Sequence, residues 1–411
     1  MNTFRVYDPE QDGDAAFRIW KEVGWAEDDE KKREAFDLFV GASRALVAEI
    51  AGAAECLVLS MPGSLRYLGE SLSFSAVTGV TTSRVARKQG LAGRLTARLI
   101  AEDVAEGALV AGLGIFEQGF YDRLGFGSGG YEHWLAFDPA QLEVDVQHRV
   151  PRRITPEDWE AVHLSRRARL QGHGAVNLEP EDFTQAEMIW SKNGFGLGYF
   201  DGPDGELTHH LWLQGDKEHG PYTLLWCSYR TGEQFRELMA LLKSLGDQVR
   251  MVWMREPPSI QMQDFLEQPF RFRQLTEKSK YEQRMNATAY WQMRICDLAG
   301  CMAKTHLRGE TVRFNLLFTD RIEYFLEDEA PWRGLTGEYI ITLGPESHAE
   351  SGRNPSLPTL TASVNAFTRL WLGVRPATGL AITDTLFGSP SLLAELDRAL
   401  RLPQPKPDWD F

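Results

Sequence analysis

The chain has 411 residues, of which 43% are hydrophobic and 25% charged, and its formal net charge is −14. This length favours two or three domains, and the negative charge argues against a nucleic-acid partner. The charge would attract a cationic small molecule, although solubility alone also explains an acidic composition. No apolar run reaches the length of a membrane span, the start lacks a signal-peptide pattern, and the four cysteines are scattered. We therefore expect a cytoplasmic protein without a disulfide framework.

Helices and strands alternate along residues 1–140. Apolar residues at helical spacing predict helices over residues 14–23 and 28–40. The stretches RALVAEI, ECLVLSM and LSFSAVTGV predict strands, with turns at AGA and at Pro62-Gly63. A loop then leads into a predicted helix over residues 90–107, a strand over 108–116 and a short helical turn in FYDRLGFG.

The same order recurs in the middle of the chain. Pro151 interrupts the pattern, and TPED is a helix start signal. A predicted hairpin around DGPDG, the strand YTLLWCSY, a helix over residues 233–246 and the strand QVRMVWM follow. Because strand, loop, helix and strand recur after about 140 residues, we expect two copies of one fold.

A third unit begins near residue 290. Strands are predicted in TVRFNLLFTD and GEYIITLG, and helices over residues 362–373 and 391–401. The segment 346–358 is predicted to be an exposed loop, and the chain ends in PQPKPDWDF. This order of elements predicts an α+β unit.

The segment VTTSRVARKQGLAGRL, residues 80–95, carries the first chemical signal. A strand ends, Arg87 and Lys88 follow, and Gly90 opens a helix with Ala92 and Gly93 in its first turn. Small residues allow a ligand to approach the backbone, and the free N–H groups of a helix start attract an anion. The spacing Arg-x-x-Gly-x-Ala differs from that of a P-loop or of a dinucleotide site. On its own it is also compatible with a purely structural helix start.

About 30 residues later, FYDRLGFG places Tyr121 before a Gly-Phe pair. Together with the preceding loop, this pattern resembles the GNAT N-acetyltransferase superfamily. The resemblance implies that Tyr121 protonates the departing thiolate of coenzyme A, which a hydroxyl with a pKa near 10 can do as charge develops. It also implies an acetyl-CoA site, in which the backbone of residues 80–82 faces the thioester. The implied cofactor residues are Val80, Thr81, Thr82, Arg87, Lys88, Gln89, Gly90, Leu91, Ala92 and Gly93.

The second copy lacks these features. Its corresponding loop reads CSYRTGEQFREL, which has no basic pair before Gly-x-Ala and places Glu233 where a phosphate would approach. A Tyr-x-x-x-Gly-Phe is also missing. We therefore interpret it as a GNAT-like domain that no longer binds the cofactor.

A working GNAT domain, a silent one and a C-terminal α+β unit resemble the Eis ("enhanced intracellular survival") acetyltransferase family. The resemblance implies domains over residues 1–145, 146–286 and 287–411, the last with a sterol-carrier-like fold suggested by MRICDL and FTRLWLG. It further implies a hexamer, and a chain end whose Phe411 carboxylate enters the first domain as the catalytic base.

The tail has two readings. An α-carboxylate is a weak base in water, and burial beside Trp409 and Phe411 would strengthen it. Alternatively, the aromatic tail only fastens the third unit to the first. For a cationic amine, the predicted acceptor residues are Trp25, Glu27, Asp28 and Asp410, although WAEDDE is also an ordinary solvated helix start.

Other sites are not predicted. Adjacent His209 and His210 would point to opposite faces of a strand, and Cys296 and Cys301 lack partners at zinc spacing, so we expect no metal. Arg84 and Gln89 depart from the family pattern at the loop, and Gly114 stands where some members carry histidine. The competing function is a lipid- or sterol-binding protein with a vestigial GNAT half.

Overall fold

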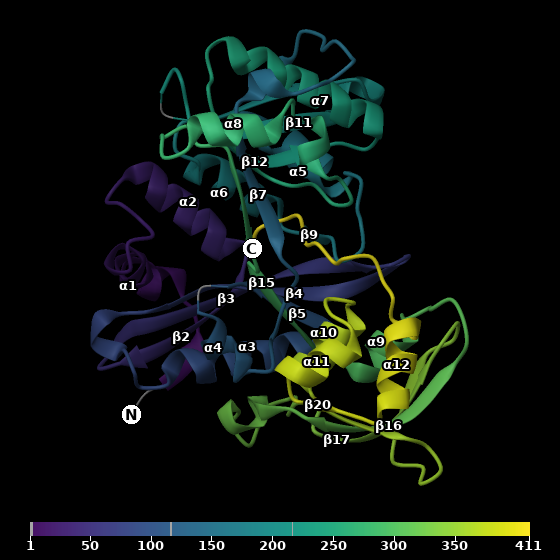
Figure 1. Ribbon diagram of the computed structural model, residues 1–411. Coiled ribbons are helices and arrows are strands. Elements are labelled where there is room, and N and C mark those ends of the chain that lie inside the picture. Colours follow the sequence, from purple (N-terminus) through teal and green to yellow (C-terminus); the bar gives the residue numbers. More distant parts are fainter. Residues whose placement is uncertain (1–2, 116, 216) are drawn as a thin grey trace.

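The computed structural model describes residues 3–115, 117–215 and 217–411, which form three β-sheets flanked by helices (Figure 1). The architecture is mixed α+β, as the sequence predicts. Within the described part of the chain, no helix is long and apolar enough to cross a membrane.

The first sheet is built mainly from the N-terminal third of the chain. Its strand order is β1 (Thr3–Val6), β2 (Arg44–Ile50), β3 (Ala53–Tyr67), β4 (Glu70–Thr82), β5 (Val110–Gly114), β15 (Trp291–Ile295) and β6 (Gly127–Ser128), and β9 (Val176–Leu178) pairs with β3. Only β4 and β5 run parallel along this path. Its helices are α1 (Pro9–Glu22), α2 (Glu30–Gly41), α3 (Leu91–Ala105) and α4 (Gln118–Asp122).

The second sheet repeats this plan. Its order is β8 (Arg152–Ile154), β10 (Gly194–Tyr199), β11 (His209–Gly215), β12 (Tyr222–Ser228), β13 (Val252–Arg255), β7 (Glu132–Phe137) and β14 (Arg284–Thr288). The parallel pair, β12 with β13, occupies the same place in the order as β4 with β5. Its helices are α5 (Trp159–Arg167), α6 (Glu181–Trp190), α7 (Gly232–Ser244) and α8 (Pro269–Thr276).

The two halves exchange strands. β15 follows the second half in sequence but lies between β5 and β6 of the first sheet, whereas β7 lies between β13 and β14 of the second. The sheets are therefore not divided at residues 145/146 and 286/287. Every residue of β15 is buried, and its Arg294 pairs with Asp320 of the third unit at 2.6 Å, both side chains being fully buried.

The third sheet has the order β18 (His348–Ser351), β17 (Gly337–Leu343), β16 (Val312–Thr319), β19 (Thr359–Ser363) and β20 (Leu386–Phe387). Its helices are α9 (Leu298–Ala303), α10 (Val364–Trp371), α11 (Ala377–Thr383) and α12 (Pro390–Ala399). After α12 the chain runs back to the centre of the molecule and ends between the first two sheets (Figure 1).

Two local predictions are wrong. The segment predicted as an exposed loop contains β18, whose exposed edge position hides its strand character in the sequence. The Pro62-Gly63 turn is instead the middle of the long strand β3, and the hairpin turns after Tyr67. Gly63 is needed there because β9 approaches closely: a Cβ at this position would lie 2.5 Å from the Asn177 carbonyl oxygen.

Candidate active site

The site begins where β4 and β5 part. The two strands pair from Phe74 to Val77 and then separate. Just beyond, β4 carries a bulge at Gly79 and Val80, seen as a shift in its register with β3. Gly79 has φ +59°, and a Cβ there would lie 2.6 Å from Leu59 Cδ1. A bulge bends its strand and interrupts the ladder, so backbone groups of β4 can face a ligand.

A cleft of about 900 Å³ opens along the end of β4 and the start of α3. Each of the predicted cofactor residues lines it: Val80, Thr81, Thr82, Arg87, Lys88, Gln89, Gly90, Leu91, Ala92 and Gly93. Gly90 caps α3 in the left-handed conformation, with φ +75°. Among the described residues, no carboxylate pairs with Arg87 or Lys88, so their charges are available to an anion beside the helix N-terminus.

Gly93 also has a structural reason to be small. A Cβ at this position would lie 3.2 Å from Phe325 Cε1, in the third unit. The small residue at this position therefore also allows the third unit to pack on the first turn of α3.

Tyr121 lies on α4 at the other wall of this cleft and is 7% exposed. Burial, together with Glu117 and Cys56, raises the pKa of its hydroxyl to about 12. Glu117 and Arg123 line the same wall. Sequence analysis did not identify Glu117 or Arg123 as site residues, and their position next to the Tyr121 motif was the only indication that they line the cleft.

A second cleft of about 510 Å³ adjoins the first and contains the chain end. Thr78 and Gly79 of β4 line it, and Trp25 lines both clefts. The Phe411 ring packs edge-on against Phe74 with centroids 5.4 Å apart. A terminal oxygen of Phe411 lies 3.2 Å from where a Cβ of Gly114 would be, so the absence of a side chain there makes room for the carboxylate.

The walls of this second cleft are mainly aromatic. They come from all three parts of the chain: Trp20, Trp25, Phe39, Phe183, Trp190, Trp226 and Phe411. Most of these rings were not found from sequence, because no local pattern links α1, α6 and β12. Both of its side-chain carboxylates are paired, Glu187 with Arg166 and Asp410 with Arg255.

Of the predicted acceptor residues, Trp25 and Asp410 line the second cleft but Glu27 and Asp28 do not. Asp28 is exposed and pairs with Lys21 at 2.8 Å, and Glu27 is exposed at the same turn. This corrects the expectation for both carboxylates: they belong to the solvated start of α2. Within the described residues, no group of three His, Cys, Asp or Glu side chains could hold a metal ion.

Comparison with known proteins agrees with this geometry. Residues 7–129 match the family of acetyltransferase (GNAT) domains, and no curated protein matches the chain in sequence. A probable N-acyltransferase from Enterococcus faecalis is similar over all of both chains, with a TM-score of 0.80 and 16% identity. A GCN5-related N-acetyltransferase from Kribbella flavida aligns over 100% of this chain and 99% of its own, with a TM-score of 0.74 and 16% identity. Eis1 from Mycobacterium abscessus aligns over all of both chains, with a TM-score of 0.74 and 14% identity.

Proposed function

We propose that this chain, whose N-terminal domain is a GNAT acetyltransferase domain, moves the acetyl group of acetyl-CoA directly onto a primary amine in a ternary complex. One observation carries the proposal: the terminal carboxylate of Phe411 and the hydroxyl-bearing Tyr121 lie in adjoining clefts along one strand, β4. A base and an acid on either side of the parted strands are what amine acetylation needs.

The first cleft suits acetyl-CoA. Arg87, Lys88 and the N–H groups at the start of α3 would hold the pyrophosphate, and the bulged end of β4 would direct backbone N–H groups at the thioester oxygen. The nitrogen, as the neutral amine, attacks the thioester carbon, the carbon–sulfur bond breaks, and the nitrogen loses a proton to the Phe411 carboxylate. Tyr121 donates a hydrogen bond to the departing thiolate, which takes up a proton from water as the Phe411 carboxyl releases the one it accepted.

The pKa of Tyr121 defines its role. Because burial raises that pKa to about 12, the hydroxyl remains protonated throughout the neutral range. It is a weaker acid than a thiol, whose pKa is about 8.5, so its main contribution is a hydrogen bond that strengthens as the sulfur becomes negative. The second cleft complements this arrangement by placing the half-buried chain end among largely apolar walls.

The second cleft also bears on the acceptor. Aminoglycosides, polyamines and lysine side chains all carry ammonium groups, but an aminoglycoside needs many polar partners once buried. Aromatic walls suit the alkyl arm and the cation of a polyamine or a lysine. We therefore propose these two acceptors ahead of the aminoglycoside, with Trp25 and Asp410 beside the bound amine.

Further parts of the proposal follow the Eis resemblance. We propose catalytic, silent and sterol-carrier-like roles for residues 1–145, 146–286 and 287–411, a hexameric assembly and a cytoplasmic location without a nucleic-acid partner. The lipid-binding alternative, with a vestigial GNAT half, is less well supported, because the cofactor cleft retains its basic loop and its tyrosine.

The decisive test moves the terminal carboxylate while keeping every side chain. Two glycines added after Phe411 should lower kcat for a polyamine at least 100-fold, in line with the loss of a general base, and leave acetyl-CoA binding unchanged. Coenzyme A release measures turnover, and the thermal shift with acetyl-CoA measures binding. The matched control inserts two glycines after the exposed Gly352, which lines neither cleft. Unchanged turnover in the extended protein would remove Phe411 from the chemistry.

A further inference from the structure

We infer that the second half, which lacks a cofactor loop, uses its own strand opening as a binding site for the C-terminal tail and thereby positions the Phe411 carboxylate in the first half. This rests on the proposed role of Phe411 as the base. It assigns a function to the silent half, because residues far from the chemistry would then set the position of the catalytic group.

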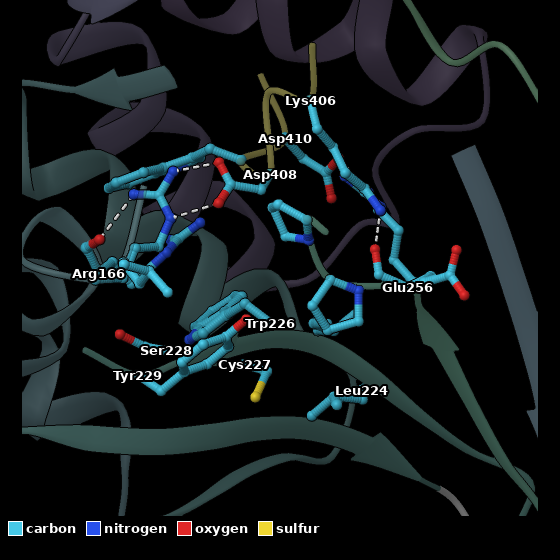
Figure 2. A pocket seen from close by; sticks show the side chains of 17 residues that line it. Arg166, Leu224, Trp226, Cys227, Ser228, Tyr229, Glu256, Lys406, Asp408 and Asp410 are labelled. Carbon is cyan, nitrogen blue, oxygen red and sulfur yellow. Dashed lines mark hydrogen bonds and ion pairs between the residues drawn. The ribbon is translucent and has the colours of Figure 1, made fainter. Parts of the chain in front are cut away.

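The tail lies at the equivalent opening of the second sheet. β12 and β13 pair from Tyr222 to Leu224 and then part, as β4 and β5 do in the first sheet. The opening is lined by residues 224–228 of β12 and Tyr229 after it, by Arg255 at the end of β13 and residues 256–258 after it, and by tail residues 406 and 408–410 (Figure 2). One half therefore opens onto the cofactor cleft, and the other is filled by the chain itself.

Asp408 is the main polar anchor. Its two carboxylate oxygens accept hydrogen bonds from Arg169 Nε at 3.0 Å and Nη2 at 2.5 Å. Arg169 is 8% exposed and also donates to the backbone oxygens of Arg166 and Val176, at 2.7 and 2.8 Å. A two-pronged pair of this kind fixes orientation as well as distance. Asp408 adopts φ +48°, a conformation uncommon for a residue other than glycine and held here by its surroundings.

Trp409 is the main apolar anchor and is 2% exposed. Its ring centroid lies 4.0 Å from the guanidinium carbon of Arg166. The same guanidinium carbon lies 4.2 Å from the ring centroid of Trp226. The cation is thus in contact with one ring from the tail and one from β12. Such contacts are stronger in a site shielded from water.

The tail backbone is also held. The backbone N–H of Lys406 donates to the backbone carbonyl of His173 at 3.0 Å, and the backbone N–H of Val176 donates to the backbone carbonyl of Pro407 at 2.9 Å. Gly174 allows this approach, since a Cβ there would lie 2.6 Å from the Lys406 nitrogen. The Lys406 ammonium donates to the backbone carbonyl oxygen of Glu256, a contact that Figure 2 marks with a dashed line.

These anchors restrict the catalytic group. Asp408 and Trp409 are fixed, and Phe411 follows two residues after Trp409, each step spanning 3.8 Å between Cα atoms. The carboxylate therefore has little freedom beyond its docked position. The conformational entropy of the carboxylate is therefore lost when the protein folds rather than when the transition state forms. Precise placement matters, because displacing a catalytic group by 1 Å can reduce a rate by about 100-fold. Arg169 and Arg166 are accordingly positioning residues.

The test is Asp408→Asn in the full-length protein. The control is Arg167→Met, because Arg167 lies on α5 beside Arg166 but is exposed. We expect kcat to fall at least tenfold, with the KM for acetyl-CoA within twofold. Hydrogen exchange at the Val176 amide, which donates to the tail, should accelerate. Trp409→Leu provides the same readouts if Asp408→Asn does not fold.

The outcomes separate this inference from the proposed function. Normal kcat in Asp408→Asn, when the two-glycine extension abolishes turnover, would overturn the positioning role and leave the base in place. Normal kcat in the protein extended by two glycines would show that the Phe411 carboxylate is not the base, and the positioning role would then also be overturned. Reduced kcat with a protected Val176 amide would also overturn the inference, because the tail would still be docked.

Discussion

The two halves of the molecule share a fold and differ in what their parallel strands enclose. In the first half, residues 83–90 connect β4 to α3 and carry a basic pair and a left-handed glycine. In the second, only residues 229–231 connect β12 to α7. The shorter connection contains one basic residue, Arg230, and no glycine, so we expect no phosphate cradle there. We propose that the length and charge of this one loop, rather than the sheet order, separate the two halves in function.

The first prediction tests whether the first half can stand alone. Residues 1–140 by themselves should not fold, because β15 would be missing between β5 and β6. Burying Trp291, Met293 and Ile295 contributes about 2 kcal/mol each, a large share of a net stability of about 5–15 kcal/mol. Circular dichroism and proteolysis would measure this. Fusing residues 289–297 to the fragment should restore protection, and a cooperative thermal transition in the bare fragment would contradict the strand exchange.

The second prediction concerns chemistry confined to one half. Tyr121→Phe should lower kcat about 100- to 1000-fold, with little change in the KM for acetyl-CoA, because only the hydroxyl is lost. Tyr222→Phe, on β12 of the second half, is the matched control and should keep full activity. Burial raises the pKa of Tyr121 to about 12, so this hydroxyl does not titrate below pH 10. Any change of wild-type activity with pH in that range should therefore occur at the same pH in Tyr121→Phe. Retained turnover in this variant would exclude the acid.

The third prediction displaces the chain end slightly. Gly114→Ala places a methyl group 3.2 Å from the Phe411 oxygen, so the carboxylate must shift by a few tenths of an ångström. We expect kcat to fall about 3- to 10-fold without loss of acetyl-CoA binding. Gly232→Ala, at the start of α7 with nothing nearby, should be neutral. Equal kcat in both variants would place the reacting atoms elsewhere.

The smallest effect is expected from acidification. Burial, with Arg166 and Arg167, lowers the pKa of His163 to about 4, and its ring packs against Trp409 with centroids 5.9 Å apart. The unfolded chain, with a histidine pKa near 6.5, binds this proton first, so stability present above pH 6.5 is lost as pH falls towards 4. Melting temperatures should show less acid sensitivity in His163→Gln than in wild type. The variant His348→Gln, at an exposed histidine, should behave as wild type, and identical curves for all three proteins would contradict the assignment.

The sequence indicated much of the first half's chemistry. Arg87, Lys88, Gly90 and Tyr121 lie within short motifs whose spacing is set by a strand, a tight loop and a helix start, so local patterns were enough to place them along one cleft. The acceptor side was predicted less well. Trp25 and Asp410 reach the cleft, but Glu27 and Asp28 remain in solvent, since an acidic run before a helix serves the helix N-terminus equally well.

By itself, the sequence determined the order of most strands and helices, the recurrence of one plan and the basic loop of the first half. These features depend on hydrophobic periodicity and on glycine, which act over a few residues. Only the tertiary structure decided that β7 and β15 change sheets, and that Asp408 docks on Arg169 across 239 positions in the chain. Such contacts depend on which surfaces remain uncovered after every sheet has formed, and no local pattern encodes that.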